Sequence, residues 1–153
     1  MKNFYISVTL LIFSCVTVAA EKAVKGLDHL GLSVSDLSAS ETFFTKALGF
    51  SVAGRDADYP AAFLSNGDIF ITLWQTKAES TVPFNRKNNV GLHHLALQVS
   101  SLEKLHGLHQ SLENYEGVKI EFAPELSYGG PAMHMMLREP SGNRIELIHR
   151  PKK

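Results

Sequence analysis

The sequence predicts an α+β fold built from two similar βαβββ modules, and two observations lead to this prediction. A twelve-residue stretch that begins at Gly26 returns 65 residues later, at Gly91, with eight of its twelve residues identical. Each copy is followed by a helix signal and then by three short strand-like runs. A repeat with this spacing indicates two copies of one supersecondary unit.

The repeated stretch is predicted to be a strand with one buried face. Apolar residues alternate with small or polar residues in both copies, which is the pattern of a half-buried strand. The apolar faces consist of Leu30, Leu32 and Val34 in the first copy and Leu95, Leu97 and Val99 in the second. His29 and His94 occupy the same place in the two copies, and both fall on the opposite, less crowded face.

Helix and strand signals complete each module. Ser38 with Glu41 predicts a capping box for the first helix, and Ser100 with Glu103 predicts one for the second. The strand-like runs are 50–55, 61–65, 68–75, 118–123, 132–138 and 144–149. We therefore expect a single domain over residues 21–153, made of module one (26–76), a linker (77–89) and module two (90–150).

The first twenty residues are predicted to be a secretory signal peptide. Lys2 precedes an apolar run over residues 4–18 that is short for a membrane span, and small residues precede Glu21 as at a cleavage site. A lipoprotein signal ending at Cys15 is the less favoured alternative, because Phe13 fits such a signal poorly. We expect an exported protein, periplasmic or secreted, without a membrane span after cleavage.

Composition excludes several classes of function. Apolar residues make up 44% of the 153 residues, which is enough for a proper core. Lys and Arg number 15, as do Asp and Glu, so no electrostatic footprint for nucleic acid is visible. Cys15 is the only cysteine and would leave with the signal peptide. We therefore expect neither disulfides nor thiol chemistry in the exported protein.

A mid-strand carboxylate supplies the third member of a candidate metal site. Glu146 lies between Ile145 and Leu147, where burying a charge is costly unless a partner compensates it. Two imidazoles and one carboxylate form the facial triad of non-haem iron sites, and they also suit zinc, manganese or nickel. We therefore predict a divalent metal ion bound by His29, His94 and Glu146.

Two motifs resemble the vicinal oxygen chelate superfamily over residues 26–150. The first motif, Asp-His-Leu-x-Leu-x-Val-x-Asp-Leu, begins at Asp28 near the start of module one. The second, Glu-Pro-Ser-Gly-Asn-Arg-Ile-Glu-Leu, begins at Glu139 near the end of module two. The superfamily includes glyoxalase I, extradiol dioxygenases, methylmalonyl-CoA epimerase, and fosfomycin and bleomycin resistance proteins. The resemblance implies an open, U-shaped mixed sheet around a metal cleft. It also implies that the ligand positions are His29, Thr72, His94 and Glu146.

Two departures from the family pattern narrow the hypothesis. Glyoxalase I has a glutamate and the epimerase a glutamine where this chain has Thr72, so a His-His-Glu set remains, as in extradiol dioxygenases and fosfomycin enzymes. This set favours Fe²⁺ or Mn²⁺ over Zn²⁺ or Ni²⁺. Those enzymes also carry a tyrosine at the position of Met136. Tyr128 and His134 lie nearby in sequence and are our candidates for catalytic acid–base groups.

The favoured function is a divalent-metal-dependent, dioxygenase-like enzyme that acts on a small substrate with vicinal oxygens. The alternatives are a glyoxalase-type lyase and a metal-free protein that sequesters a small molecule, as bleomycin resistance proteins do. Glutathione and coenzyme A are scarce outside the cytoplasm, which weighs against glyoxalase and epimerase substrates.

Small members of the superfamily commonly form dimers, so the resemblance implies a homodimer. In such a dimer His29 can face His94 and Glu146 of the partner chain. The sequence also suggests roles for three further side chains. Arg144 is either an anion-binding group in the cleft or a surface arginine, while Phe70 and Trp74 are interpreted as core residues.

Overall fold

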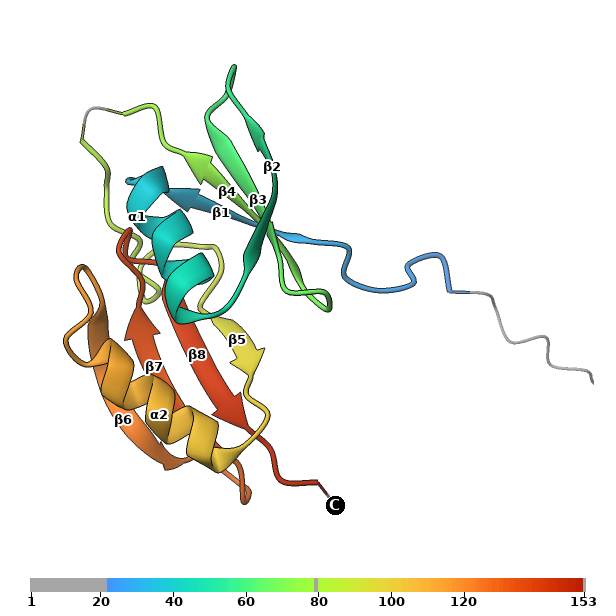
Figure 1. Ribbon diagram of the computed structural model, residues 1–153, viewed down its shortest axis with the longest axis vertical. Helices are drawn as coiled ribbons and strands as arrows, with labels where there is room; N and C mark the ends of the chain where they lie inside the picture. The colour runs from blue at the N-terminus through green and yellow to red at the C-terminus, as the bar shows by residue number, and fades with distance from the viewer. Residues whose placement is uncertain (1–21, 79, 153) are drawn as a thin grey trace, which may run out of the picture.

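The computed structural model describes residues 22–78 and 80–152 and contains both predicted modules (Figure 1). Module one consists of β1 (Leu30–Val34), α1 (Leu37–Thr42), a π-helical turn η1 (Phe43–Ala47), β2 (Ser51–Asp56), β3 (Ala61–Ser65) and β4 (Phe70–Gln75). Module two consists of β5 (Leu95–Gln98), α2 (Leu102–Leu112), β6 (Lys119–Leu126), β7 (Met133–Arg138) and β8 (Arg144–His149). The predicted α+β fold of two βαβββ modules is confirmed. The predicted signal peptide and Cys15 lie outside the described residues.

Each module forms one four-stranded mixed sheet. The strand orders are β1-β4-β3-β2 and β5-β8-β7-β6, so the first strand of each module lies beside its last. These first and last strands run parallel, and the other pairs are antiparallel. In module two, Leu95 pairs with Ile145 and Ala96 with Glu146. The topology thus brings the strand that follows His94 alongside the strand that carries Glu146.

The helices begin at other residues than the capping boxes predict. Asp36 caps α1, where its Oδ1 accepts a hydrogen bond from the Ala39 amide at 2.9 Å. Ser101 caps α2, where its hydroxyl accepts one from the Lys104 amide at 3.1 Å. Both residues follow their strands at equivalent places of the repeat, and each turns the chain directly into a helix. Ser38 falls inside the first turn of α1, so it cannot serve as the cap.

One hydrophobic core draws side chains from both modules. The apolar faces predicted for β1 and β5 are buried at Leu32, Val34 and Leu97. The rings of Phe43 in η1 and Tyr115 after α2 lie 6.0 Å apart and join the two halves. The opposite faces of the sheets lie outside this core, although Thr72, Glu146 and Ile148 on them are also nearly buried.

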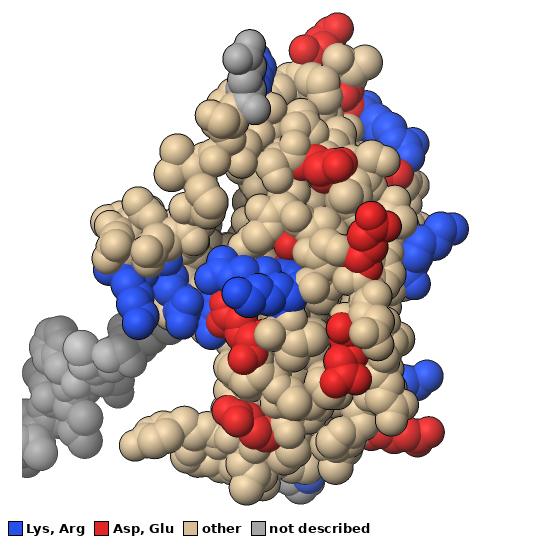
Figure 2. All heavy atoms as spheres, turned by 90° about the vertical axis from the view of Figure 1, so that its left-hand side faces the viewer, with Lys and Arg blue, Asp and Glu red and all other residues tan. Residues whose placement is uncertain are grey.

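The molecular surface carries charges of both signs. Figure 2 shows Asp and Glu side chains scattered over one face and Lys and Arg side chains gathered near its middle. No helix within residues 22–78 and 80–152 is long and apolar enough to cross a membrane.

The turn between β7 and β8 encloses a buried carboxylate. Glu139 is 1% exposed and accepts hydrogen bonds from the Ser141 and Asn143 amides, both at 3.0 Å, and from Asn143 Nδ2 at 2.9 Å. Gly142 completes the turn with φ +89°, a conformation that other residues rarely adopt. The family-like Glu-Pro-Ser-Gly-Asn segment therefore folds around its own first residue.

The same turn joins module two to module one. Ser40 in α1 donates its hydroxyl to Glu139 at 2.6 Å, and Asn143 Nδ2 donates to the Ser33 carbonyl at 3.0 Å. The Ser141 hydroxyl accepts hydrogen bonds from the Ser35 and Asp36 amides at 3.0 and 3.2 Å. The C-terminal end of β1 is thus fixed beside the start of β8, and the two strands leave this junction in different directions (Figure 1).

Replacing Glu139 by alanine is expected to lower the free energy of unfolding by roughly 3–5 kcal/mol, because the donors that meet its carboxylate would stay buried without an acceptor. Urea unfolding measures this loss. The exposed Glu116 is the matched control, and Glu116→Ala should change stability by less than about 0.5 kcal/mol. Equal losses for the two variants would show that the buried carboxylate does not hold the modules together.

Candidate functional site

Glu146 lies between two histidines, on the face of the second sheet that points away from the hydrophobic core. It is only 9% exposed, and its Oε2 lies 3.1 Å from Nε2 of His94, just before β5. Its other oxygen, Oε1, is hydrogen-bonded to Nδ1 of His134 in β7. β7 is the neighbour of β8, and His134 also packs its ring against Phe122, with centroids 5.0 Å apart. Two imidazoles therefore compensate one nearly buried carboxylate.

His94 and Glu146 are spaced as two ligands of one divalent metal ion would be. A separation of 3.1 Å between an imidazole nitrogen and a carboxylate oxygen suits two neighbouring ligands that each lie about 2.1 Å from one ion. The contact with His134 occupies Oε1 and leaves Oε2 directed at His94. His134 thus has the arrangement of a residue that orients a metal ligand.

The structure does not bring His29 to this pair within one chain. Its Nδ1 lies 2.6 Å from the carboxylate of the neighbouring Asp28, and half of its side chain is exposed. Within residues 22–78 and 80–152, no three His, Cys, Asp or Glu side chains are grouped so that they could hold a metal ion. His94 and Glu146 therefore form two thirds of the predicted set, and His29 stands open at the start of β1.

The other predicted residues are placed as follows. Tyr128 lies in the turn between β6 and β7 with a fully exposed side chain, so nothing directs it toward Glu146. Met136 pairs with Glu146 across the ladder and brings no acid–base group. Thr72 is buried in β4, and its hydroxyl accepts a hydrogen bond from Trp74 Nε1 at 2.8 Å. The Thr72 hydroxyl is therefore engaged within its own strand.

His93 contacts His94 directly, which the strand pattern of the repeat does not predict. Alternation would turn it to the opposite face from His94, yet the two Nδ1 atoms lie 2.8 Å apart. This segment precedes β5, so strand alternation does not apply to it. Desolvation and the positive charge of Arg144 hold the pKa of His93 below its ordinary value.

Sequence reasoning missed an aromatic surface on the open face of module one. Phe70 and Trp74 are only partly buried and lie outside the core, contrary to their interpretation as core residues. The Trp74 ring lies 5.7 Å from that of Phe63 and 5.3 Å from that of Tyr59, while the Phe70 ring lies 6.2 Å from His29. Alternation alone could have shown that Phe70, Thr72 and Trp74 share one face, but not that this face stays open.

Comparison with known proteins agrees with this architecture. The family model of the Glyoxalase/Bleomycin resistance protein/Dioxygenase superfamily matches residues 26–147. The chain belongs to this superfamily. Enzymes of the superfamily use divalent metals and act on small molecules. Membership therefore agrees with the donor set found at His94 and Glu146.

Individual relatives cover most of the chain. It is 32% identical over 124 residues to the glutathione transferase FosA of Serratia marcescens, which covers 81% of this chain and 80% of that protein. A superfamily domain from Frankia sp. EAN1pec superposes with a TM-score of 0.71 at 22% identity, covering 85% of this chain and 95% of that chain. A lactoylglutathione lyase from Agrobacterium tumefaciens gives 0.62 at 20%, covering 84% and 96%. These two solved structures show the fold alone.

A charged network lies beside the site on the same sheet. Glu121 in β6 accepts one hydrogen bond from Nε of Arg144 at 2.7 Å and forms an ion pair with Nε of Arg138 at 2.9 Å. Burial raises the pKa of Glu121, but Arg144, Arg138 and Arg86 outweigh it and hold the pKa below its ordinary value of 4.5. The carboxylate is therefore charged throughout the neutral range.

The lowered pKa of Glu121 gives a pH dependence of stability. A carboxyl group whose folded pKa lies below its unfolded value contributes stability above the unfolded pKa, and this contribution is lost as pH falls through the folded pKa. At neutral pH, Glu121→Gln should lower the free energy of unfolding by roughly 1–3 kcal/mol, because two guanidinium groups lose their charged acceptor. Unfolding curves measured down to acidic pH should show the difference from wild type shrinking below pH 4.5. A difference independent of pH would contradict this assignment.

Proposed function

We propose that the protein is a divalent-metal-dependent enzyme whose metal is held by His94 and Glu146 of one chain and His29 of a second. The observation that carries this proposal is the arrangement of the three residues in one chain. His94 and Glu146 lie 3.1 Å apart, whereas His29 occupies the equivalent place of the other module, half-exposed and outside their reach. A second copy can supply the missing histidine, and a closed dimer suits two such sites.

The surroundings of the metal ligands support a substrate with two adjacent oxygens and a flat apolar part. Three protein ligands leave positions on the ion for such a chelating substrate. Phe70 and Trp74 lie on the same open face as His29, so they would accompany it to the shared site. When bound, the ion supplies Lewis acidity to the substrate oxygens. His134 holds the Glu146 carboxylate and is the candidate acid–base group, acting through its Nε2.

The reaction that we favour is dioxygenase-like and acts on a catechol-like vicinal diol. The aromatic surface and the His-His-Glu set support it. The hydrogen bond from Trp74 to the Thr72 hydroxyl supports it too, because it leaves Thr72 out of the ligand set. A glutathione-dependent transfer or lyase reaction is the second candidate, because a glutathione transferase is 32% identical to this chain. The export signal that we propose for residues 1–20 weighs against a glutathione substrate.

Alanine substitution of any one of His29, His94 or Glu146 is expected to weaken metal binding by at least roughly tenfold, because each supplies a bond to the ion. Calorimetric titration of the metal-free protein with Mn²⁺ measures the affinity. Thr72→Ala is the matched control and should bind almost as wild type does, since the Thr72 hydroxyl is bonded to Trp74. Loss of binding in Thr72→Ala, with binding retained in His29→Ala, would show that the ligand set is a different one.

Oxygen uptake separates the candidate reactions. The Fe²⁺- or Mn²⁺-loaded protein should consume O₂ with at least one vicinal diol from a panel, and Thr72→Glu should suppress this because a fourth protein ligand would occupy a substrate position. Zn²⁺- and Ni²⁺-loaded samples, assayed for hemithioacetal isomerisation and glutathione transfer, test the second candidate. Tight binding of a ligand that emerges unchanged, without turnover in any assay, would contradict an enzymatic function.

A further inference from the structure

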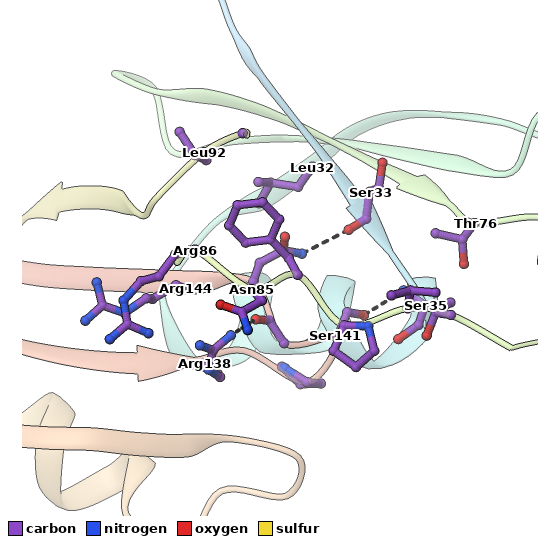
Figure 3. Close-up of a pocket in the computed structure, with 18 of the residues that line it drawn as sticks. Leu32, Ser33, Ser35, Thr76, Asn85, Arg86, Leu92, Arg138, Ser141 and Arg144 are labelled. Carbon is purple, nitrogen blue, oxygen red and sulfur yellow. Dashed lines mark hydrogen bonds between the residues drawn. The ribbon is translucent and has the colours of Figure 1, made fainter. Parts of the chain in front are cut away.

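A cleft of about 1010 Å³ lies between the linker and the junction of the two modules. Its walls come from the polar face of β1, linker residues 81–87 and the turn that follows β7. Arg86, Arg138 and Arg144 gather at one end of the cleft, as Figure 3 shows. These three residues, which we call the arginine group, come from the linker, β7 and β8.

Glu121 fixes how two of these arginines are presented. It contacts both Arg138 and Arg144 through their Nε atoms, so the inner edge of each guanidinium is occupied. Arg138 Nη1 donates to the Gly142 carbonyl at 2.9 Å. Among the described residues, no hydrogen bond engages the terminal Nη groups of Arg144, although its side chain is only 9% exposed and lines the cleft. One carboxylate thus holds two guanidinium groups while the Nη groups of Arg144 remain available.

Arg86 adds a third positive charge without a compensating carboxylate. No ion pair engages it within residues 22–78 and 80–152. It lines the same cleft as Arg144 and lies beside it in Figure 3, and its charge contributes to the lowered pKa of Glu121. The arginine group carries three positive charges, and among the described residues Glu121 is the one carboxylate that forms an ion pair with any of them. A purely structural ion-pair network would need Arg138 and Arg144 but not Arg86.

The arginine group lies close to the proposed metal ligands. Arg144 and Glu146 are two residues apart on β8, so they share one face of the sheet and lie about 7 Å apart along the strand. Guanidinium groups with free Nη atoms bind carboxylates and phosphates through paired hydrogen bonds.

We propose that the arginine group binds an anionic group, a carboxylate or a phosphate, carried by the substrate whose vicinal oxygens bind the metal. This inference rests on the proposed function for its link to the metal, whereas the anion site itself does not require a metal. The substrate class that follows is a small acid whose charged group is separated by a few bonds from its two adjacent oxygens.

The test is calorimetric titration of the metal-free, full-length protein with inorganic phosphate and, separately, with acetate. Wild type should bind at least one of the two saturably at one site per chain, and the tighter anion identifies the class. Arg86→Ala should weaken that binding roughly tenfold, which corresponds to one charge-assisted contact. Arg55→Ala is the matched control, because Arg55 pairs with Glu41 on module one and does not line the cleft.

Two further measurements keep the test decisive. Arg86→Ala should bind Mn²⁺ as wild type does, so a failure of the anion site is separable from a failure of the metal site. Arg144→Lys keeps the charge but loses the paired donors, so it should also weaken anion binding. Absence of saturable binding of both anions to wild type, or equal weakening by Arg86→Ala and Arg55→Ala, would overturn the proposal.

Discussion

The Glu139 carboxylate lies between the two modules, where it accepts hydrogen bonds from its own turn and from Ser40 of module one. A buried carboxylate is stable only when such donors surround it, so the turn and α1 must keep this arrangement together. The relative placement of the modules follows from it. β8 begins where β1 ends, and Asn143 adds a direct bond to the β1 backbone.

This placement has a consequence for the site. β1 ends at the Glu139 turn and β8 begins there, and the two strands point in different directions (Figure 1). Residues of the two strands that are farther from this turn therefore lie farther apart. His29 precedes β1 at its far end, whereas Glu146 lies within β8. The interaction that joins the modules therefore also separates the two halves of the predicted ligand set. One chain of a shared site would show an exposed His29 and a Glu146–His94 pair with no third metal-binding side chain grouped beside it in residues 22–78 and 80–152.

Much of the fold and part of the site could be predicted from the sequence. The repeat gave the modules, and alternation gave the buried faces of β1 and β5, because a strand with one covered face must alternate. The donor types and the family resemblance then assigned His94 and Glu146 to one site, and the pairing of β5 with β8, which the structure shows, brings them together. The contacts of Glu146 with His134 and of Arg144 with Glu121 could not be predicted, because they depend on the registers of β6, β7 and β8. Phe70 and Trp74 were misassigned because aromatic residues are common both in cores and on open sheet faces.

Metal analysis of a mixed dimer tests whether two chains share each metal site. Chains carrying His29→Ala and chains carrying Glu146→Ala, each with a different affinity tag, can be co-expressed and the mixed dimer purified. One of its two sites would combine the intact His29 of one chain with the intact His94 and Glu146 of the other, while the second site would carry both changes. We expect one tightly bound ion per mixed dimer and none in either parent dimer. A mixed dimer without metal, or a His29→Ala parent that binds as wild type does, would show that the site is not shared.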